Sequence, residues 1–258
     1  MGTIIKHSEK HLALFSAPCK YIDDVLALVK RDQFVEWDLN TLPFSLSTKR
    51  MAYVRDFIKE HGEVRFHLPY GFWDLGVNDE IIFQDSFRYY CRLFSTIEFL
   101  ESSVAVIHIG TAAGSDKETS IRGLTRLVAE AKNHNVKLCV ENLIHGLSSD
   151  MTFLKRCLEI DGIYFCLDTG HAEFLRRRNG EKIFEDIFSV KEKILHAHVY
   201  DVEDDNMNHV PFTDVTLKSN VWLPLLSASN CAWYTMELDL QSDQDNQKML
   251  LEKYIAQN

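Results

Sequence analysis

Short apolar runs alternate along the chain with stretches in which apolar residues recur every three or four positions. The runs are rich in β-branched and aromatic residues, as buried strands are, and the stretches between them have helical periodicity. Eight runs occur, at 12–17, 34–39, 64–69, 104–109, 137–142, 164–168, 194–200 and 233–239. The alternation predicts βα units whose strands form a parallel sheet.

Two of the intervening stretches show the helical pattern most clearly. The first has apolar residues at Ile22, Val25, Leu26 and Val29, and the second at Ile121, Leu124, Leu127, Val128 and Ala131. Ser115 and Glu118 match the capping-box spacing just before the second stretch, so we expect a helix to begin there.

Eight strands that alternate with helices in 258 residues are what a closed (β/α)8 barrel, or TIM barrel, requires. An open doubly wound sheet usually carries a GxGxxG turn after its first strand, and the segment "FSAPCKYIDD" has none. The chain also lacks a Pro/Gly/Ser-rich linker and an internal repeat. We therefore expect an α/β fold, with a single TIM-barrel domain over residues 1–258.

The charge balance argues against a nucleic-acid partner. There are 38 acidic and 28 basic residues, for a formal net charge of −10, which opposes binding to phosphate backbones. No apolar stretch is long enough to span a bilayer, and the first residues lack the apolar core of a signal peptide. The six cysteines form no CxxC pair and mostly fall in apolar patterns. A cytoplasmic protein that does not bind membranes is expected.

Polar residues occur at the carboxyl ends of six successive predicted strands. They are His67, His108, Glu141, Asp168, His198 and Glu237. Taken singly, a strand histidine is commonly a hydrogen-bonded core residue, and a strand-end acid is commonly a helix N-cap. In a TIM barrel, however, all of these ends face one mouth, so six in succession favour a shared site.

Three acids beside several histidines point to a bound metal, because a buried charge costs several kcal/mol unless it is paired or coordinates a cation. Carboxylate and imidazole ligands without thiolate favour Mn²⁺ or Zn²⁺, with Mg²⁺ or Co²⁺ as alternatives. The residue types predict the class of metal and leave its identity open.

Seven short motifs in a fixed order resemble the xylose isomerase-like TIM-barrel superfamily. They are "HLPY" (67–70), "HIG" (108–110), "VEN" (140–142), "LDTGHA" (167–172), "HVYD" (198–201), "NHVPF" (208–212) and "MELD" (236–239). That group contains sugar and sugar-phosphate isomerases and epimerases, and also the endonuclease IV enzymes of DNA repair. The resemblance runs from about the first predicted strand to the last.

The epimerase branch of this superfamily implies a metal held by Glu141, Asp168, His198 and Glu237. The resemblance also places His171 near the substrate or a further metal. Moving a proton between neighbouring carbons of a ketose needs a polarised carbonyl and a stabilised ene-diolate. Glu141 and Glu237 are then the candidate acid/base pair, and His171 is a candidate to polarise a substrate oxygen.

The repair branch implies three metals, with His67, His108 and His209 as additional ligands. The sequence departs from that pattern at Met207, where the repair enzymes have the acid of an Asp-x-His pair. It also has Gly170 where they have cysteine. We therefore expect an isomerase or epimerase acting on a small sugar or sugar phosphate. An endonuclease IV-like AP endonuclease and a non-catalytic, metal-dependent sugar-binding protein are the alternatives.

Two other features carry weaker expectations. His196 lies in phase with His198 along its strand and is expected to support the site instead of ligating a metal. The "LRRR" segment (175–178) is expected to be a solvated helix face, with phosphate binding as the alternative.

Overall fold

The computed structural model describes residues 11–13, 16–17, 25–27, 29–30, 34–39, 47–206, 208–238 and 241–257. One parallel sheet forms its centre, with the strand order β1-β11-β8-β7-β6-β5-β4-β3-β2. The strands are β1 (His11–Ala13), β2 (Ser16–Ala17), β3 (Phe34–Asp38), β4 (Glu63–His67), β5 (Val104–Ile107), β6 (Lys137–Glu141), β7 (Ile163–Asp168), β8 (Ile194–His198) and β11 (Trp233–Thr235).

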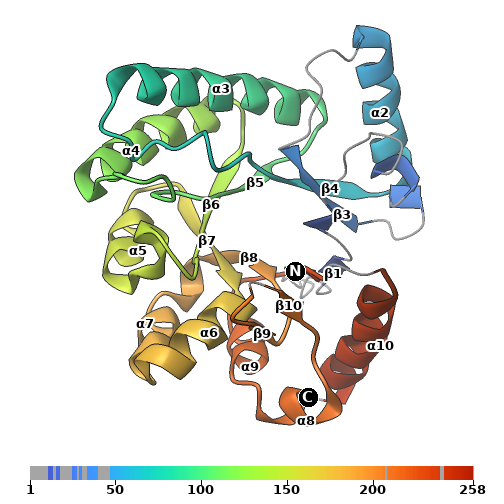
Figure 1. Cartoon of the computed structure of the whole chain (residues 1–258). Helices are drawn as coiled ribbons and strands as arrows, with labels where there is room; N and C mark the ends of the chain where they lie inside the picture. The colour runs from blue at the N-terminus through green and yellow to red at the C-terminus, as the bar shows by residue number, and fades with distance from the viewer. Residues whose placement is uncertain are drawn as a thin grey trace, which may run out of the picture.

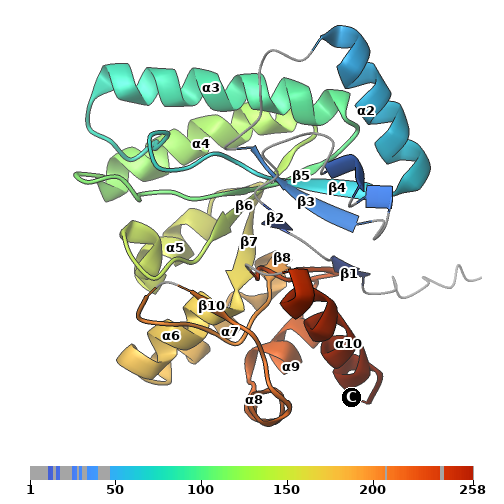
Figure 2. The same ribbon diagram turned by 45° about the vertical axis from the view of Figure 1, so that its right-hand side comes forward.

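The first predicted strand closes the barrel. Its beginning, β1, pairs in parallel with β11, and its continuation, β2, pairs in parallel with β3. The sheet therefore returns on itself, and helices surround it in Figures 1 and 2. The TIM-barrel prediction is confirmed.

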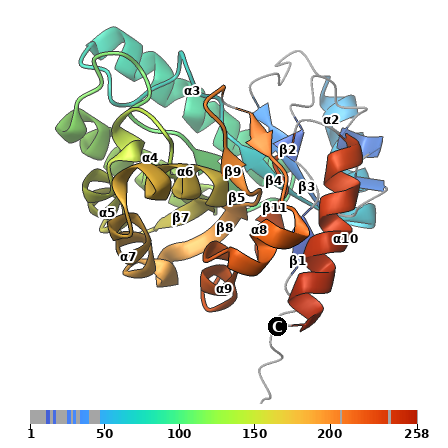
Figure 3. The same ribbon diagram turned by 60° about the horizontal axis from the view of Figure 1, so that its bottom comes forward.

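A helical layer follows the strands around the outside. It consists of α2 (Thr48–His61), α3 (Glu80–Phe99), α4 (Lys117–Asn133), α5 (Met151–Leu158), α6 (Thr169–Asn179), α7 (Lys182–Phe188), α8 (Asp214–Ser219), α9 (Trp222–Ser227) and α10 (Gln241–Gln257). The structure also contains two short 3₁₀ turns, η2 (Leu147–Ser149) and η3 (Lys191–Lys193), and a small antiparallel pair, β9 (Val202–Glu203) with β10 (His209–Val210). Residues 25–27 and 29–30 are helical as well. Figure 3 shows α8, α9 and α10 as neighbouring parts of this outer layer. No helix among the described residues is both long and apolar enough to cross a membrane.

The predicted apolar faces pack into the core. Val25, Leu26 and Val29 are buried there, whereas Ile22 lies outside the described residues. The predicted capping box before α4 was wrong by one residue. Asp116 is the N-cap, and its carboxylate accepts from the backbone amide of Thr119 at 2.8 Å.

Alternate residues of the strands point into the barrel, because the side-chain period of a strand is two. A small apolar cluster of Val104, Val106, Cys139 and Cys166 forms part of this interior. The two inward positions that follow Cys139 and Cys166 on their strands are Glu141 and Asp168. The barrel interior therefore changes from apolar to charged toward the carboxyl ends of the strands.

Gly123 shows how closely α4 packs on the loop that precedes α3. A Cβ at this position would lie 2.7 Å from Cβ of Leu75 and 2.9 Å from its backbone oxygen. In an exposed helix, Gly→Ala stabilises by about 1 kcal/mol. Here we expect Gly123→Ala to destabilise the protein by about 1–3 kcal/mol, because a backbone oxygen has to move.

Chemical denaturation would measure this change in the free energy of unfolding. Thr125→Ala, at an exposed position of the same helix, is the matched control and should be neutral or slightly stabilising. An equal stabilisation in both variants would contradict the packing.

Candidate metal centre

Four of the predicted ligands come together at the carboxyl end of the barrel. Glu141, Asp168 and His198 are the last residues of β6, β7 and β8, and Glu237 lies two residues after β11. One ligand atom from each of these four residues lies within 4.8 Å of the others. We refer to Glu141, Asp168, His198 and Glu237 as the quartet.

The imidazole of His198 lies at the centre of the quartet. Its Nδ1 is 3.0 Å from Oε2 of Glu237, 3.4 Å from Oε1 of Glu141 and 3.8 Å from Oδ2 of Asp168. Burial by itself would raise the pKa of Glu237, but His198 outweighs it and lowers the pKa to about 2. Three acids thus surround one ring nitrogen.

Two atoms of the quartet indicate that it fits a cation. Nδ1 of His198 and Oδ2 of Asp168 are fully buried and have no hydrogen-bond partner among the described residues. Burial raises the pKa of Asp168 to about 7, against the opposing effect of His171. Buried polar atoms are almost always satisfied, so two such atoms that face each other fit a divalent cation between them.

The backbone around Asp168 explains its orientation. Its Oδ1 accepts from the backbone amide of His171 at 2.7 Å and caps α6. The side chain of Asn142 exchanges hydrogen bonds with the backbone N–H and C=O of Asp168, both at 2.9 Å. Gly170 is required next to it, because a Cβ there would overlap the ring of Tyr200. One oxygen therefore holds the helix and the other is left to the quartet.

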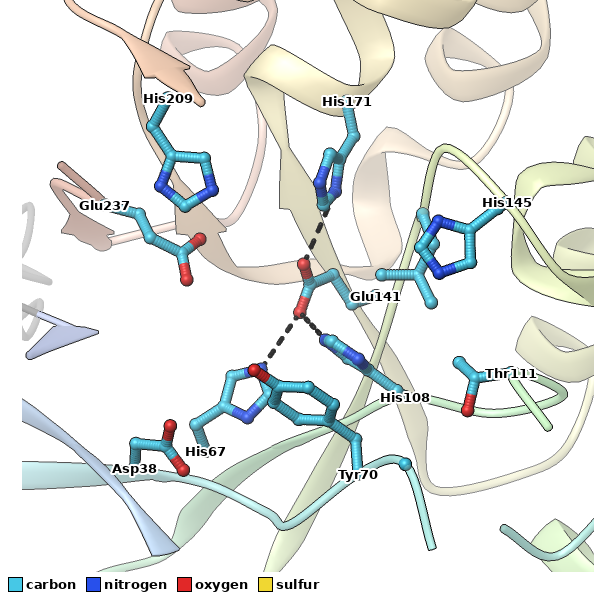
Figure 4. A pocket seen from close by; sticks show the side chains of 12 residues that line it. Asp38, His67, Tyr70, His108, Thr111, Glu141, His145, His171, His209 and Glu237 are labelled. Atoms are coloured by element: carbon cyan, nitrogen blue, oxygen red, sulfur yellow. Dashed lines mark hydrogen bonds and ion pairs between the residues drawn. The ribbon is translucent and has the colours of Figure 1, made fainter. Parts of the chain in front are cut away.

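A second cluster shares Glu141 with the quartet. Nε2 of His67 and Nε2 of His108 lie 3.3 and 3.0 Å from Oε2 of Glu141, as Figure 4 shows. Burial would raise the pKa of Glu141, but imidazoles led by His198 and His108 hold it well below its usual range. These three side chains also satisfy the distance requirement of a metal site.

The two histidines of this second cluster differ in charge. Nδ1 of His67 contacts the backbone oxygen of Leu68 at 3.0 Å, so both ring nitrogens face acceptors. Burial opposes protonation of His67, but its hydrogen bond to Glu141 raises the pKa to about 9. Burial lowers the pKa of His108. His67 therefore neutralises part of the acidic charge.

A cavity of about 320 Å³ opens above these clusters (Figure 4). Its lining includes the predicted residues His67, His108, Glu141, His171, His209 and Glu237. It also includes Asp38, Tyr70 and His145, which the sequence did not single out. The ring of Tyr70 stacks on His108, with centroids 4.6 Å apart. The volume is that of a small-molecule site.

His209 lines the cavity but belongs to neither cluster. Its Nε2 lies 3.5 Å from Oε2 of Glu203, which also accepts from the hydroxyl of Tyr200 at 3.1 Å. Met207 lies outside the described residues. An acid from β9 thus accompanies His209, and no sequence pattern indicated it.

The arginines of the "LRRR" segment are engaged with acids. Arg176 and Arg177 pair with Glu173, and Arg178 pairs with Asp205. These contacts agree with the predicted helix face.

Glu36, which was not among the predicted site residues, lies beneath the quartet. This side chain is fully buried and contacts the imidazoles of both His196 and His198. Burial would raise its pKa, but the two imidazoles hold the pKa well below its usual range. Two acids at alternate positions of an apolar strand, Glu36 and Asp38, were the available signal. His196 faces Glu36, in agreement with its predicted supporting role.

Comparisons with known proteins agree with this fold. An uncharacterised protein of Methanocaldococcus jannaschii is 26% identical over 161 residues, which cover 62% of this chain and 66% of that protein, just under two thirds. Endonuclease IV from Thermus thermophilus has a similar structure, with TM-score 0.70, 14% identity and coverage of 96% and 98% of the two chains. A D-tagatose 3-epimerase-like protein gives TM-score 0.68 and 17% identity, with coverage of 86% and 88%. A D-psicose 3-epimerase in the presence of D-fructose gives 0.61 and 17%, with coverage of 92% and 89%.

The family described as xylose isomerase-like TIM barrel matches residues 32–247, most of the chain and all but the first part of its barrel. This match, with the closed parallel barrel and the acids and histidines at its carboxyl end, shows that the chain belongs to the xylose isomerase-like TIM-barrel family.

Proposed function

We propose that this protein is a divalent-metal-dependent isomerase or epimerase acting on a small sugar or sugar phosphate. The observation that carries the proposal is the quartet. Oδ2 of Asp168 and Nδ1 of His198 are buried without a hydrogen bond among the described residues, and Glu141 and Glu237 line a cavity of about 320 Å³. The likeness to D-tagatose and D-psicose epimerase structures supports it.

Glu141, Asp168, His198 and Glu237 would hold the metal, and their oxygen and imidazole donors fit Mn²⁺ or Zn²⁺, with Mg²⁺ or Co²⁺ as alternatives. A divalent cation bound there would supply a Lewis acid that polarises a substrate carbonyl and stabilises an ene-diolate. The side chains around the cavity perform the remaining steps.

Glu237 and Glu141 have different roles in proton transfer. Glu237 is 21% exposed and lines the cavity, so its carboxylate can reach a substrate carbon. Glu141 is 2% exposed, and its Oε2 contacts His67 and His108. We assign proton abstraction to Glu237 and proton return, on the opposite face, to Glu141 with its paired imidazoles.

His171 would orient a substrate oxygen. Its Nδ1 contacts the backbone oxygen of Asn142 at 2.9 Å, and because a carbonyl only accepts, Nδ1 carries a proton. Burial opposes protonation of the ring, but Asp168 and Glu141 raise the pKa of His171, which favours a proton on Nε2 as well. Nε2 can then donate to a substrate oxygen in the cavity that His171 lines and polarise it.

A second candidate function is phosphodiester hydrolysis of the endonuclease IV type. The specific observation in its favour is the cluster of His67, His108 and Glu141, which shares a carboxylate with the quartet. Two cations bridged by one carboxylate are a common arrangement for phosphoester hydrolysis. The acidic net charge weighs against a nucleic-acid substrate.

The first prediction of this function concerns metal binding by the quartet. Asp168→Asn should lower the content of divalent metal at least tenfold, because it removes an anionic ligand. Elemental analysis after metal loading and desalting measures it. Asp116→Asn is the matched control, since Asp116 caps α4 as Asp168 caps α6. Equal metal content in wild type and Asp168→Asn would remove the basis of the site.

The second prediction concerns the proton. Wild-type, metal-loaded protein should wash solvent deuterium into one carbon of a ketose or ketose phosphate, because a carboxylate proton exchanges with water during turnover. Glu237→Gln should slow this exchange by about 10²-fold or more. NMR of a ketose panel in deuterated water follows it, with metal content measured in parallel.

If the wild type exchanges none of the panel, the isomerase proposal fails. Binding of a ketose without exchange would then favour the sugar-binding protein.

The third prediction separates the two enzymatic candidates by the number of metals. We expect one tightly bound metal per chain, with the same content in His67→Ala and His108→Ala, because neither belongs to the quartet. Two or three metals in the wild type, with loss of one in these variants, would favour the hydrolase. Nicking of abasic-site DNA at modest protein concentration would then contradict the isomerase.

A further inference from the structure

A chain of hydrogen bonds runs through the barrel beneath the quartet and ends on His198. It links Arg65 of β4, His196 of β8, Glu36 of β3 and His198 of β8. Its role rests on the metal site proposed above, because what the chain does is prepare His198 to bind a cation there.

The first link has only one possible direction. Nη1 of Arg65 lies 3.1 Å from Nδ1 of His196 and also donates to the backbone oxygen of Leu195 at 3.2 Å. A guanidinium donates and never accepts. Nδ1 of His196 therefore accepts, and the ring proton of His196 is on Nε2. The guanidinium stacks 4.3 Å from the ring of Trp233, which holds it in place.

The carboxylate of Glu36 accepts a hydrogen bond from each donor that contacts it. Its Oε2 accepts from Nε2 of His196 and from the hydroxyl of Thr235, both at 2.7 Å. Its Oε1 lies 3.2 Å from Nε2 of His198. Because a carboxylate only accepts, the imidazole nitrogen of His198 that faces it carries the proton. Nδ1, the atom at the centre of the quartet, is then the ring nitrogen that can present a lone pair to a cation.

We propose that Arg65, His196 and Glu36 are positioning residues that keep a proton on Nε2 of His198 and so leave Nδ1 as the nitrogen that binds the metal. A metal ligand must present a lone pair, and the group bound to the other ring nitrogen decides which nitrogen that is. Glu36 contacts neither the cavity nor the substrate; it acts through His198.

Replacing Glu36 by glutamine would reverse the direction of the hydrogen bond between residue 36 and Nε2 of His198. An amide has one accepting oxygen, and its nitrogen only donates. Arg65 keeps the proton of His196 on Nε2, so the amide oxygen turns toward His196 and Thr235. The amide nitrogen then faces Nε2 of His198, which has to accept. The proton of His198 moves to Nδ1 and blocks metal binding there.

The fourth prediction follows. Glu36→Gln should weaken binding of Mn²⁺ or Zn²⁺ to the otherwise intact protein by about 10- to 100-fold, the usual effect of losing such a partner. Competition with a chromophoric chelator measures the affinity, and thermal unfolding of the metal-free protein checks the fold. Glu98→Gln is the control, since Glu98 contacts the imidazole of His134 at 2.7 Å on the outer helices. Wild-type affinity in a folded Glu36→Gln protein would overturn the proposal.

A double variant tests the role of Arg65. In the Glu36→Gln background, Arg65→Met frees His196 to move its proton to Nδ1, so the amide oxygen can turn back to His198. We expect metal affinity to recover at least tenfold relative to Glu36→Gln alone. No recovery in a folded double variant would remove Arg65 from the positioning chain.

An imidazole NMR measurement tests the tautomer without any metal. Long-range ¹H–¹⁵N correlation on the metal-free wild type should show a proton on Nε2 of His198, and Glu36→Gln should remove it from Nε2. A wild-type His198 without a proton on Nε2, or a variant that keeps it there, would overturn the inference. A wild-type protein that binds no metal but shows the expected tautomers would contradict only the proposed function and not the hydrogen-bond chain.

Discussion

The repulsion among buried carboxylates at one end of the barrel is the constraint on which the rest of the site depends. Parallel strands bring Glu141, Asp168 and Glu237 together, and separating them from water costs several kcal/mol for each uncompensated charge. The groups in contact with them are imidazoles, which supply N–H donors and, at His67, a positive charge. A divalent cation would complete this compensation at Oδ2 of Asp168 and Nδ1 of His198, which make no hydrogen bond among the described residues.

The carboxyl-end residues could be predicted because the barrel topology converts their positions into proximity. A polar residue at the end of each apolar run is visible in the sequence, and the closed sheet requires those ends to meet. Glu36 could not be assigned in this way. Its partners His196 and Thr235 lie 160 and 199 residues away along the sequence. Its role depends on the direction of the hydrogen bonds that it makes with them. Nothing in the segment "FVEWDL" indicates which histidine the acid will meet.

Asp74 illustrates a second kind of residue that sequence patterns miss. Its buried carboxylate accepts from the backbone amides of Thr111 at 2.6 Å and Ala112 at 2.8 Å, and so holds the loop that follows His108. Every residue of a loop except proline has a backbone amide, so the sequence does not reveal which amides will converge on one side chain. Their convergence on one acid depends on the turn that Gly110 makes with a φ of 70°. The sequence therefore predicted His108 but not the contacts that fix it.

For Asp168, the two interpretations of a strand-end acid turned out to be compatible. A carboxylate has two oxygens, and here Oδ1 caps α6 while Oδ2 faces the quartet. The helix cap lowers the cost of presenting the second oxygen, because the carboxylate is already ordered before any cation arrives.

The two carboxylate oxygens of Glu141 also have different surroundings, and this difference separates the two candidate activities. Its Oε1 faces the quartet, and its Oε2 faces His67 and His108. If Oε2 stays hydrogen-bonded to the imidazoles, Glu141 can receive a proton from His67 and return it to a sugar carbon. If a second cation were held by His67, His108 and Glu141 instead, the carboxylate of Glu141 would be shared between two cations, an arrangement suited to phosphoester hydrolysis. The choice between the two chemistries thus depends on what occupies one face of one carboxylate.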